Sequence, residues 1–297
     1  MRHFKIILIP ALACLLVSPV FAQTDSTKAT ADTIKIGGMV IIKKGNGKGN
    51  DHTTSVTLGN KRKQKGGNIS TSEMIIDLGF ANWSDKTDYA TATSQHYLVN
   101  RPGQPALNSS DLRLRTGKSS NVNIWFFMQR LNLVKHYVNL KYGIGLETNN
   151  YRFSSPISFK ESGANPYDPP SSSFTIAHPF IFRDSISFKK DKLSTDYVTV
   201  PIMLNFRSNP DNSDKSISAS AGVSIGYLYN SRNKQISSER GKHKNHGDYN
   251  LKSWKFSYIG ELGLGKVRLY GSYSPNSIFD GIFNIMPYTI GVRLSNW

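Results

Sequence analysis

The chain has 297 residues, with 37 Lys and Arg against 20 Asp and Glu and a formal net charge of +17. In a cytosolic protein this charge would suggest a nucleic-acid partner, but the export signal described next argues against one, so we expect none. After that signal no apolar run is long enough for a membrane-spanning helix, so membrane residence would have to use strands.

Residues 1–22 have the pattern of a cleaved secretory signal peptide. A basic start precedes the uncharged run Ile6–Val17, and the small residues Val20 and Ala22 precede an expected cut before Gln23. The run has 12 residues, too few to span a hydrocarbon core of roughly 30 Å as a helix. A retained anchor is therefore the weaker interpretation.

A lipoprotein signal acylated at Cys14 is a competing interpretation of the same segment. It fits less well, because Cys14 lies inside the apolar run and Ala11 stands where such signals usually carry Leu. If Cys14 leaves with the signal, the mature chain has no cysteine, which excludes disulfides and thiolate chemistry.

Residues 23–70 are polar and strongly basic, with Lys43-Lys44 and Lys61-Arg62-Lys63 set among Gly and Asn. We interpret this segment as a solvated periplasmic extension, and its basic runs as solvated surface rather than a nucleic-acid patch. Two β-prone pieces, 33–42 and 53–58, are expected to pair as a hairpin, which would be marginally stable in isolation.

From residue 71 onward, eight segments alternate apolar and polar side chains with the period of two that a strand requires and a helix cannot produce. These segments are 74–81, 122–129, 138–147, 197–206, 217–229, 254–263, 267–273 and 288–294. The third alternates most clearly, with Leu140 and Tyr142 on one face and Lys141 and Gly143 on the other.

Two segments carry more specific predictions. The pattern of the second places Val122, Ile124, Phe126 and Met128 on one face, and Asn123, Trp125, Phe127 and Gln129 on the other. Pro201 interrupts the fourth segment, where the missing N–H is expected to cause a bulge or a missing ladder bond.

The connections alternate in length along the chain. Long ones (84–118, 151–193, 232–250 and 276–284) alternate with short ones (131–136, 208–215 and 264–266). This asymmetry is typical of outer-membrane barrels with short periplasmic turns and longer outside loops. We therefore predict an all-β, antiparallel up-and-down barrel of about eight strands over 71–297, located in the outer membrane. The β-prone pieces in Ile176–Phe188 leave two alternatives, an extension of the barrel walls above the membrane or a hairpin of their own, so the strand count could differ by two.

A soluble exported ligand-binding barrel or sandwich would have its apolar face inward. The opposite, polar face here carries several charges and also many Gly and Ser residues. Water-facing strands seldom need so much glycine, whereas a crowded lumen does. Together with aromatic residues near the strand ends, this favours a membrane barrel.

Three segments, Tyr197–Leu204, Ala221–Tyr227 and Tyr288–Leu294, resemble the outer-membrane β-barrel family called PorT-like, whose members are often labelled porin family or OmpA-like barrels. The resemblance covers Ser72–Trp297. It implies an envelope role and, in one branch, assistance to protein secretion. The last strand, with Thr289, Gly291 and Leu294, also resembles the assembly signal that barrel-insertion machinery recognises.

An eight-stranded barrel is normally filled by its own side chains. We expect Lys141, Glu147, Glu261, Arg268 and Arg293 to form an ion-pair network inside it, because unpaired buried charges are costly. The predicted role is structural or interactive and non-enzymatic, carried by the outside loops. Anionic lipid headgroups and the barrel-assembly machinery are the expected partners, and no cofactor is expected. A narrow porin-like channel or a secretion-associated barrel is the alternative.

An enzyme is the other alternative, because some small outer-membrane barrels modify lipids or cleave proteins. His243, His246 and Asp248 lie in the third long loop, but lysines surround them and no Gly-x-Ser-x-Gly motif is present. A His-x-x-His pair in a loop is a weak metal signal. Glu147 and Glu261 as paired acids require more assumptions than ion pairing. We therefore predict no catalytic and no metal-binding residue.

Overall fold

The computed structural model describes residues 31–36, 39–44, 53–58, 67–169, 171, 174–210, 216–265 and 267–294, the first three ranges by their backbone only. The chain divides into two units, Met1–Lys61 and Arg62–Trp297. The predicted signal peptide, 1–22, lies outside the described residues and stays a prediction.

The first unit contains a three-stranded antiparallel sheet in the order β1 (Ala31–Ile36), β2 (Met39–Lys44), β3 (Thr53–Leu58). The predicted pairing of 53–58 with the preceding piece is present between β2 and β3. However, 33–42 is not one strand: β1 and β2 pair with each other. Gly37 and Gly38 separate them in the sequence, and a Gly-Gly pair favours a two-residue hairpin turn.

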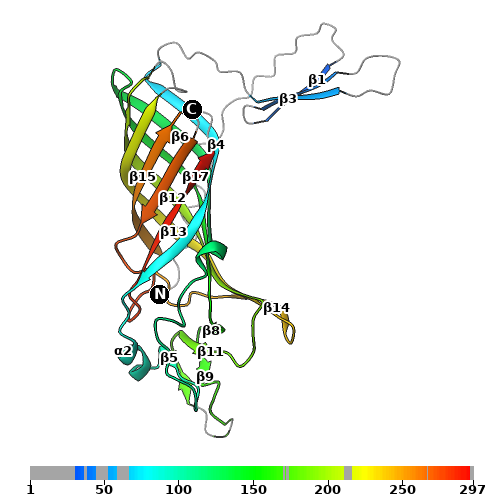
Figure 1. Cartoon of the computed structure of the whole chain (residues 1–297), viewed down its shortest axis with the longest axis vertical. Coiled ribbons are helices and arrows are strands. Elements are labelled where there is room, and N and C mark those ends of the chain that lie inside the picture. The colour runs from blue at the N-terminus through cyan, green and yellow to red at the C-terminus, as the bar shows by residue number, and fades with distance from the viewer. Residues whose placement is uncertain are drawn as a thin grey trace, which may run out of the picture. The chain divides into compact units, whose positions relative to one another are not determined.

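The second unit is a closed barrel (Figure 1). Within the described residues its wall has eight strands: β4 (Ile69–Asp85), β6 (Ser120–Val134), β7 (Val138–Arg152), β12 (Lys190–Arg207), β13 (Ile217–Ser237), β15 (Trp254–Leu264), β16 (Val267–Tyr273) and β17 (Ile285–Leu294). Each pairs antiparallel with its neighbours, and the β17–β4 pairing closes the ring. The predicted up-and-down barrel of eight strands is confirmed.

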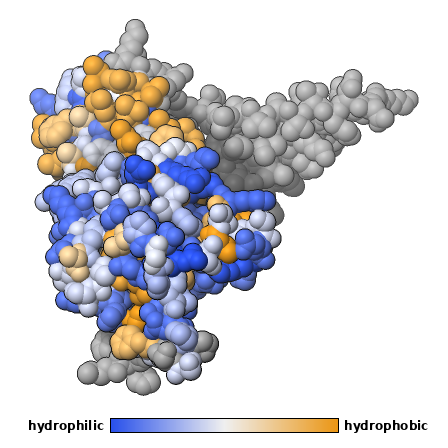
Figure 2. Space-filling model, turned by 60° about the horizontal axis from the view of Figure 1, so that its bottom comes forward, coloured by the Kyte–Doolittle hydropathy of each residue, from blue (hydrophilic) through white to orange (hydrophobic). Residues whose placement is uncertain are grey.

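The barrel wall is apolar on its outer face. At alternating positions of the wall strands, hydrophobic side chains are exposed. These side chains include Leu78, Phe80, Val198, Val200, Ile202, Leu204, Ile290 and Val292. Figure 2 shows this hydrophobic side of the barrel beside a mainly hydrophilic loop end. Such a surface is stable only against hydrocarbon, which agrees with a membrane-spanning wall.

Strand β6 departs from the predicted faces. Trp125 and Met128 both point into the lumen, whereas Phe126 and Phe127 are both exposed. The register between β6 and β7 shifts between Trp125 and Phe127, so one extra residue reverses the alternation beyond that point. The prediction that Met128 shares a face with Val122 was therefore wrong.

Pro201 causes the local defect predicted from the sequence. The pairing of β12 with β7 runs to Thr199 and resumes at Ile202 in the same register, so Val200 and Pro201 are unpaired on that side. On the other side Pro201 stays opposite Ser224 of β13. The proline thus interrupts one ladder without displacing the strand.

Glycine residues in the wall leave room for bulky side chains of the lumen to lie directly against the backbone. Gly145 lies under Trp125, whose Cε3 would be 2.7 Å from an added Cβ. Gly79 and Gly291 face each other on β4 and β17, and both lie under the ring of Tyr270. The predicted crowding of the lumen therefore accounts for these glycines.

The four long connections, residues 86–119, 153–189, 238–253 and 274–284, gather at one end of the barrel, and we call them together the cap (Figure 1). Its elements are α2 (Tyr89–Ser94), β5 (Leu98–Val99), η1 (Thr116–Lys118), β8 (Ile157–Lys160), β9 (Gly163–Ala164), β10 (Thr175–Ile176), β11 (Phe180–Arg183) and β14 (Gly241–His246). The β-prone stretch 176–188 thus adds strands to the cap, not to the wall. In the described ranges no helix is both long and apolar enough to cross a membrane.

Candidate functional site

A chain of ion pairs crosses the lumen. Arg293 of β17 donates to both carboxylate oxygens of Asp77 on β4, with Nε–Oδ1 at 2.6 Å and Nη2–Oδ2 at 2.7 Å. Its Nη1 also donates to Glu261 of β15, whose other oxygen accepts from Lys141 Nζ on β7. Since β7 and β15 are not neighbours in the wall, the last contact spans the lumen.

The Asp77 carboxylate has two further donors. Trp125 Nε1 donates to Oδ2 at 2.7 Å, and Asn123 Nδ2 donates to the same oxygen at 3.2 Å. The Arg293 guanidinium also lies over the Trp125 ring, 5.6 Å from its centroid. Charges this deeply buried are tolerated only when their hydrogen-bonding groups are satisfied.

A second ion pair joins the same two strands closer to the cap. Lys255 of β15 donates to Glu147 of β7, which also accepts from Asn149 Nδ2 at 2.9 Å and from Thr199 Oγ1 at 3.3 Å. Lys255 Nζ lies 4.6 Å from the centroid of the Tyr197 ring. Two salt bridges therefore connect opposite walls.

Of the five residues expected in one network, the structure connects Lys141, Glu261 and Arg293 directly and places Glu147 in the second pair. Arg268 is buried in the lumen but joins no ion pair among the described residues, and its Nε has no hydrogen-bond partner there. Sequence analysis missed Asp77 and Lys255 as partners. The contact of Asp77 with Arg293 depends on the pairing of β17 with β4, which closes the ring.

Little space remains between these side chains. The lumen retains a cavity of about 30 Å³, lined among others by Asp77, Trp125, Glu147 and Arg293. A cavity needs at least roughly 10–15 Å³ to hold one water molecule, so this one admits about two. This cavity is a small pocket between packed side chains.

Comparisons with known proteins agree with this architecture. The family model described as "Outer membrane protein beta-barrel domain" matches residues 89–280. The chain belongs to this family.

A search of curated proteins finds no significant match. Among solved structures, the chain is similar to Ail, the attachment invasion locus protein of Yersinia pestis, determined in complex with the heparin analogue sucrose octasulfate. The two are 14% identical, the match covers 75% of this chain and 99% of that chain, and the TM-score is 0.27. Family membership and fold place this protein in the outer membrane, as predicted from the sequence.

The cap of this outer-membrane barrel has a hydrophobic core to which all four long loops contribute. Its buried members from the loops include Ala92, Leu98, Leu107, Leu112, Leu114, Phe153, Ile157, Phe159, Ile181, Tyr249, Leu251, Ile278, Phe279 and Phe283. Trp83 and Tyr151 join it from the ends of β4 and β7, with ring centroids 4.8 Å apart. This core is not predictable from the sequence, because loop residues have no period that marks a buried face.

Ion pairs between loops reinforce the cap. Arg183 of the second loop donates to both oxygens of Asp111 in the first, at 2.8 and 2.9 Å. Arg240 of the third loop donates to Asp184 of the second at 2.9 Å. The loops are thus linked by both charge and apolar packing.

Asp191 is a buried carboxyl group at the junction of β12 with the cap. It accepts hydrogen bonds from Asn233 Nδ2 and from the Ile157 N–H, each at 3.1 Å. Burial, with a smaller contribution from the charge of Asp184, raises the pKa of Asp191 to about 7. The folded protein therefore holds a proton on Asp191 that an unfolded chain would release near pH 4.

Cap stability is accordingly expected to fall as the pH rises from about 4 to about 7, by up to about 4 kcal/mol. In Asp191→Asn this dependence should flatten, which protease-cleavage rates of the cap at each pH would measure against the unmodified protein. Asp280→Asn, at an exposed cap position, is the matched control. Equal slopes in the unmodified and Asp191→Asn proteins would contradict the assignment.

The histidines weighed as metal ligands or catalytic groups lie on β14, which is exposed throughout. His246 is paired in register with Arg232, and His243 lies between Lys242 and Lys244. Among the described residues, no group of three His, Cys, Asp or Glu is arranged to hold a metal ion. Neighbouring cations also oppose the binding of a further positive charge.

Proposed function

We propose that this protein is a sealed, non-enzymatic outer-membrane barrel whose folded cap presents a recognition surface outside the cell. The observation that carries the proposal is that the barrel lumen and the cap of the second unit are built differently. Ion pairs between β7 and β15 occupy the lumen, whereas the four loops of the cap share one hydrophobic core.

The filled lumen supports a role other than diffusion. Classical porins need about twice as many strands to enclose a water channel. Here Lys141 and Glu261 occupy the centre of the barrel, and their side chains are only 2% and 6% exposed. Charges fixed in such pairs are also poor candidates for general acid–base chemistry, which requires a group free to exchange its proton with a substrate.

The ordered cap supports a role in recognition, because a rigid binding surface loses less conformational entropy when a partner binds. Its far end carries the small sheet β5-β11-β8 over a second apolar cluster of Val99, Ile176, Phe180 and Phe182. Phe174, two residues before Ile176 in the sequence, is 53% exposed, and its ring centroid lies 5.1 Å from that of His96. A solvent-accessible aromatic side chain on a supported surface is typical of interface anchors.

Single-channel recording in planar bilayers tests the sealed lumen. We expect the purified protein to stay at baseline under conditions in which a general porin conducts. Stable open-channel steps would contradict the proposal.

Labelling of whole cells tests where the cap lies. The chain's single cysteine, Cys14, falls in the predicted signal peptide, so a cysteine introduced at exposed Ser185 of the cap would be unique. A membrane-impermeant maleimide is expected to label Ser185→Cys and to leave Lys135→Cys, in the β6–β7 turn, unlabelled until the cells are broken. The reverse pattern would place the cap in the periplasm.

A further inference from the structure

A row of four positive charges crosses the outer surface of the sheet beyond the apolar band. Arg152 of β7 is paired in register with Lys192 of β12, Lys192 with Lys234 of β13, and Lys234 with Lys244 of β14. Neighbouring strands lie about 4.8 Å apart. We call these four residues the cationic row.

A bulge in β13 helps to create the row. The register with β12 shifts between Asp196 and Tyr197, where β13 contributes one extra residue. Outward-facing residues of β13 therefore change from odd positions such as Tyr227 to even positions such as Lys234, while Asn233 becomes buried. Without this bulge Lys234 would point into the interior.

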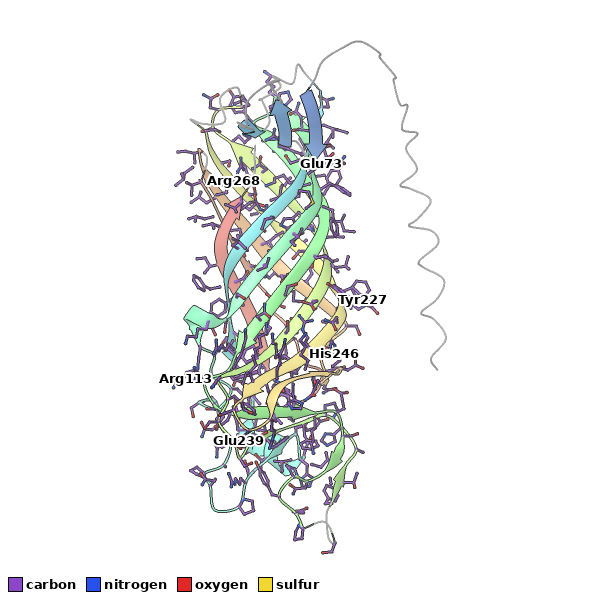
Figure 3. The ribbon with its side chains drawn as sticks, turned by 90° about the vertical axis from the view of Figure 1, so that its right-hand side faces the viewer. Glu73, Arg113, Tyr227, Glu239, His246 and Arg268 are labelled. Atoms are coloured by element: carbon purple, nitrogen blue, oxygen red, sulfur yellow. The ribbon has the colours of Figure 1, made fainter. Side chains whose placement is uncertain are left out.

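The row lies just beyond the lipid-facing part of the wall. The edge of the apolar band nearest the cap is marked by four residues that are paired across β7, β12, β13 and β15: Leu146, Val198, Tyr227 and Trp254. Arg152 follows Leu146 by six residues, which is about 15 Å along the axis of a tilted barrel. In Figure 3, His246, on β14 two residues from Lys244, accordingly lies between Tyr227 and Glu239 at the loop end.

The row has no acidic member, and no ion pair joins its residues to an acid among the described residues. Arg232, two residues before Lys234 on β13 and farther from the cap, forms an ion pair with Asp196 at 2.8 Å. On the cap side the row is flanked by Lys190 and Lys242. Burial and the neighbouring cations, Lys190 first among them, lower the pKa of Lys192 to about 8. Like charges directly opposite each other destabilise a sheet, so an anionic ligand would relieve this repulsion.

We propose that the cationic row binds the phosphate groups of a sugar-bearing lipid in the outer leaflet. The row continues the outward face of β7, β12 and β13, which contacts hydrocarbon farther from the cap. A lipid whose chains lie against Leu146 and Val198 would therefore bring its anionic sugars to the cationic row. Lysine side chains can also reach back toward the interface while their stems cover apolar surface. This site lies on the barrel wall and not on the recognition surface of the cap, and it rests on the proposed function in one respect, that the cap end faces outside the cell.

Native mass spectrometry of the full-length mature protein in neutral detergent, titrated with purified phosphorylated lipopolysaccharide, tests the proposal. Lys234→Gln/Lys244→Gln is expected to weaken binding about 30-fold, since each basic residue near an anionic surface contributes roughly a factor of five. Lys86→Gln/Lys118→Gln, which removes the same charge from exposed positions of the first loop, should bind like the unmodified protein. Heat-modifiable gel migration verifies that every variant is folded.

Two further arms identify the ligand group and its source. Enzymatically dephosphorylated lipopolysaccharide is expected to bind as weakly as the lysine double variant does. Soluble polyphosphate should compete only at much higher phosphate concentration. Equal binding by both double variants, no effect of dephosphorylation, or polyphosphate binding as tightly as the lipid would each overturn the proposal.

Discussion

Replacing Glu261 by Gln is expected to lower the free energy of unfolding by about 3–5 kcal/mol, because it leaves two buried cations without their shared acid. Glu261 accepts from Lys141 and from Arg293, and all three side chains are at most 6% exposed. Arg293 retains its ion pair with Asp77. Urea-dependent unfolding in detergent micelles, followed by the heat-modifiable gel shift, would measure the change.

A second substitution separates charge from packing in this network. Adding Lys141→Met to Glu261→Gln removes one of the two buried cations that shared this acid, so the double variant is expected to recover much of the lost stability. Glu239→Gln, at an exposed position between β13 and β14, provides the control and should unfold like the unmodified protein. If Glu261→Gln were also unchanged, the lumen network would not stabilise the barrel.

Replacing Trp83 by Ala should loosen the cap while the barrel stays folded. The Trp83 ring contacts Tyr151 and Phe153 at centroid distances of 4.8 and 5.7 Å, and its Nε1 donates to the Leu112 carbonyl at 3.2 Å. Loss of a buried tryptophan side chain costs about 3–5 kcal/mol. Faster proteolysis of the cap, with an unchanged heat-modifiable barrel, is the expected result.

Two further variants test whether the loosening of the cap comes from the ring packing of Trp83. Trp83→Phe keeps most of the ring packing and loses the hydrogen bond, so it should cost only about 1–2 kcal/mol. Trp254→Ala removes a tryptophan that is 64% exposed on the wall and should leave the cap protected. Protection of the cap in Trp83→Ala would show that its loops are held by other contacts.

Local patterns in the sequence determined the architecture of the wall. Side chains alternate at a period of two because the pleat turns successive Cβ atoms to opposite faces, and this identified every strand of the wall and most of its inward residues, including Lys141, Glu147 and Arg293. Alternating long and short connections determined the up-and-down order. A bulge leaves no such signal, so Met128 of β6 was placed on the wrong face.

Only the tertiary structure decided which inward charges meet and what the loops build. Asp77 and Arg293 are 216 residues apart in the sequence and become neighbours when β17 pairs with β4. Lys141 and Glu261 meet across the lumen, at a separation of 120 residues. The cap core, the β13 bulge and the cationic row likewise depend on register between distant strands. Periodicity reports the direction of a side chain from its own strand, whereas its partner is set by closure of the ring, which no local pattern encodes.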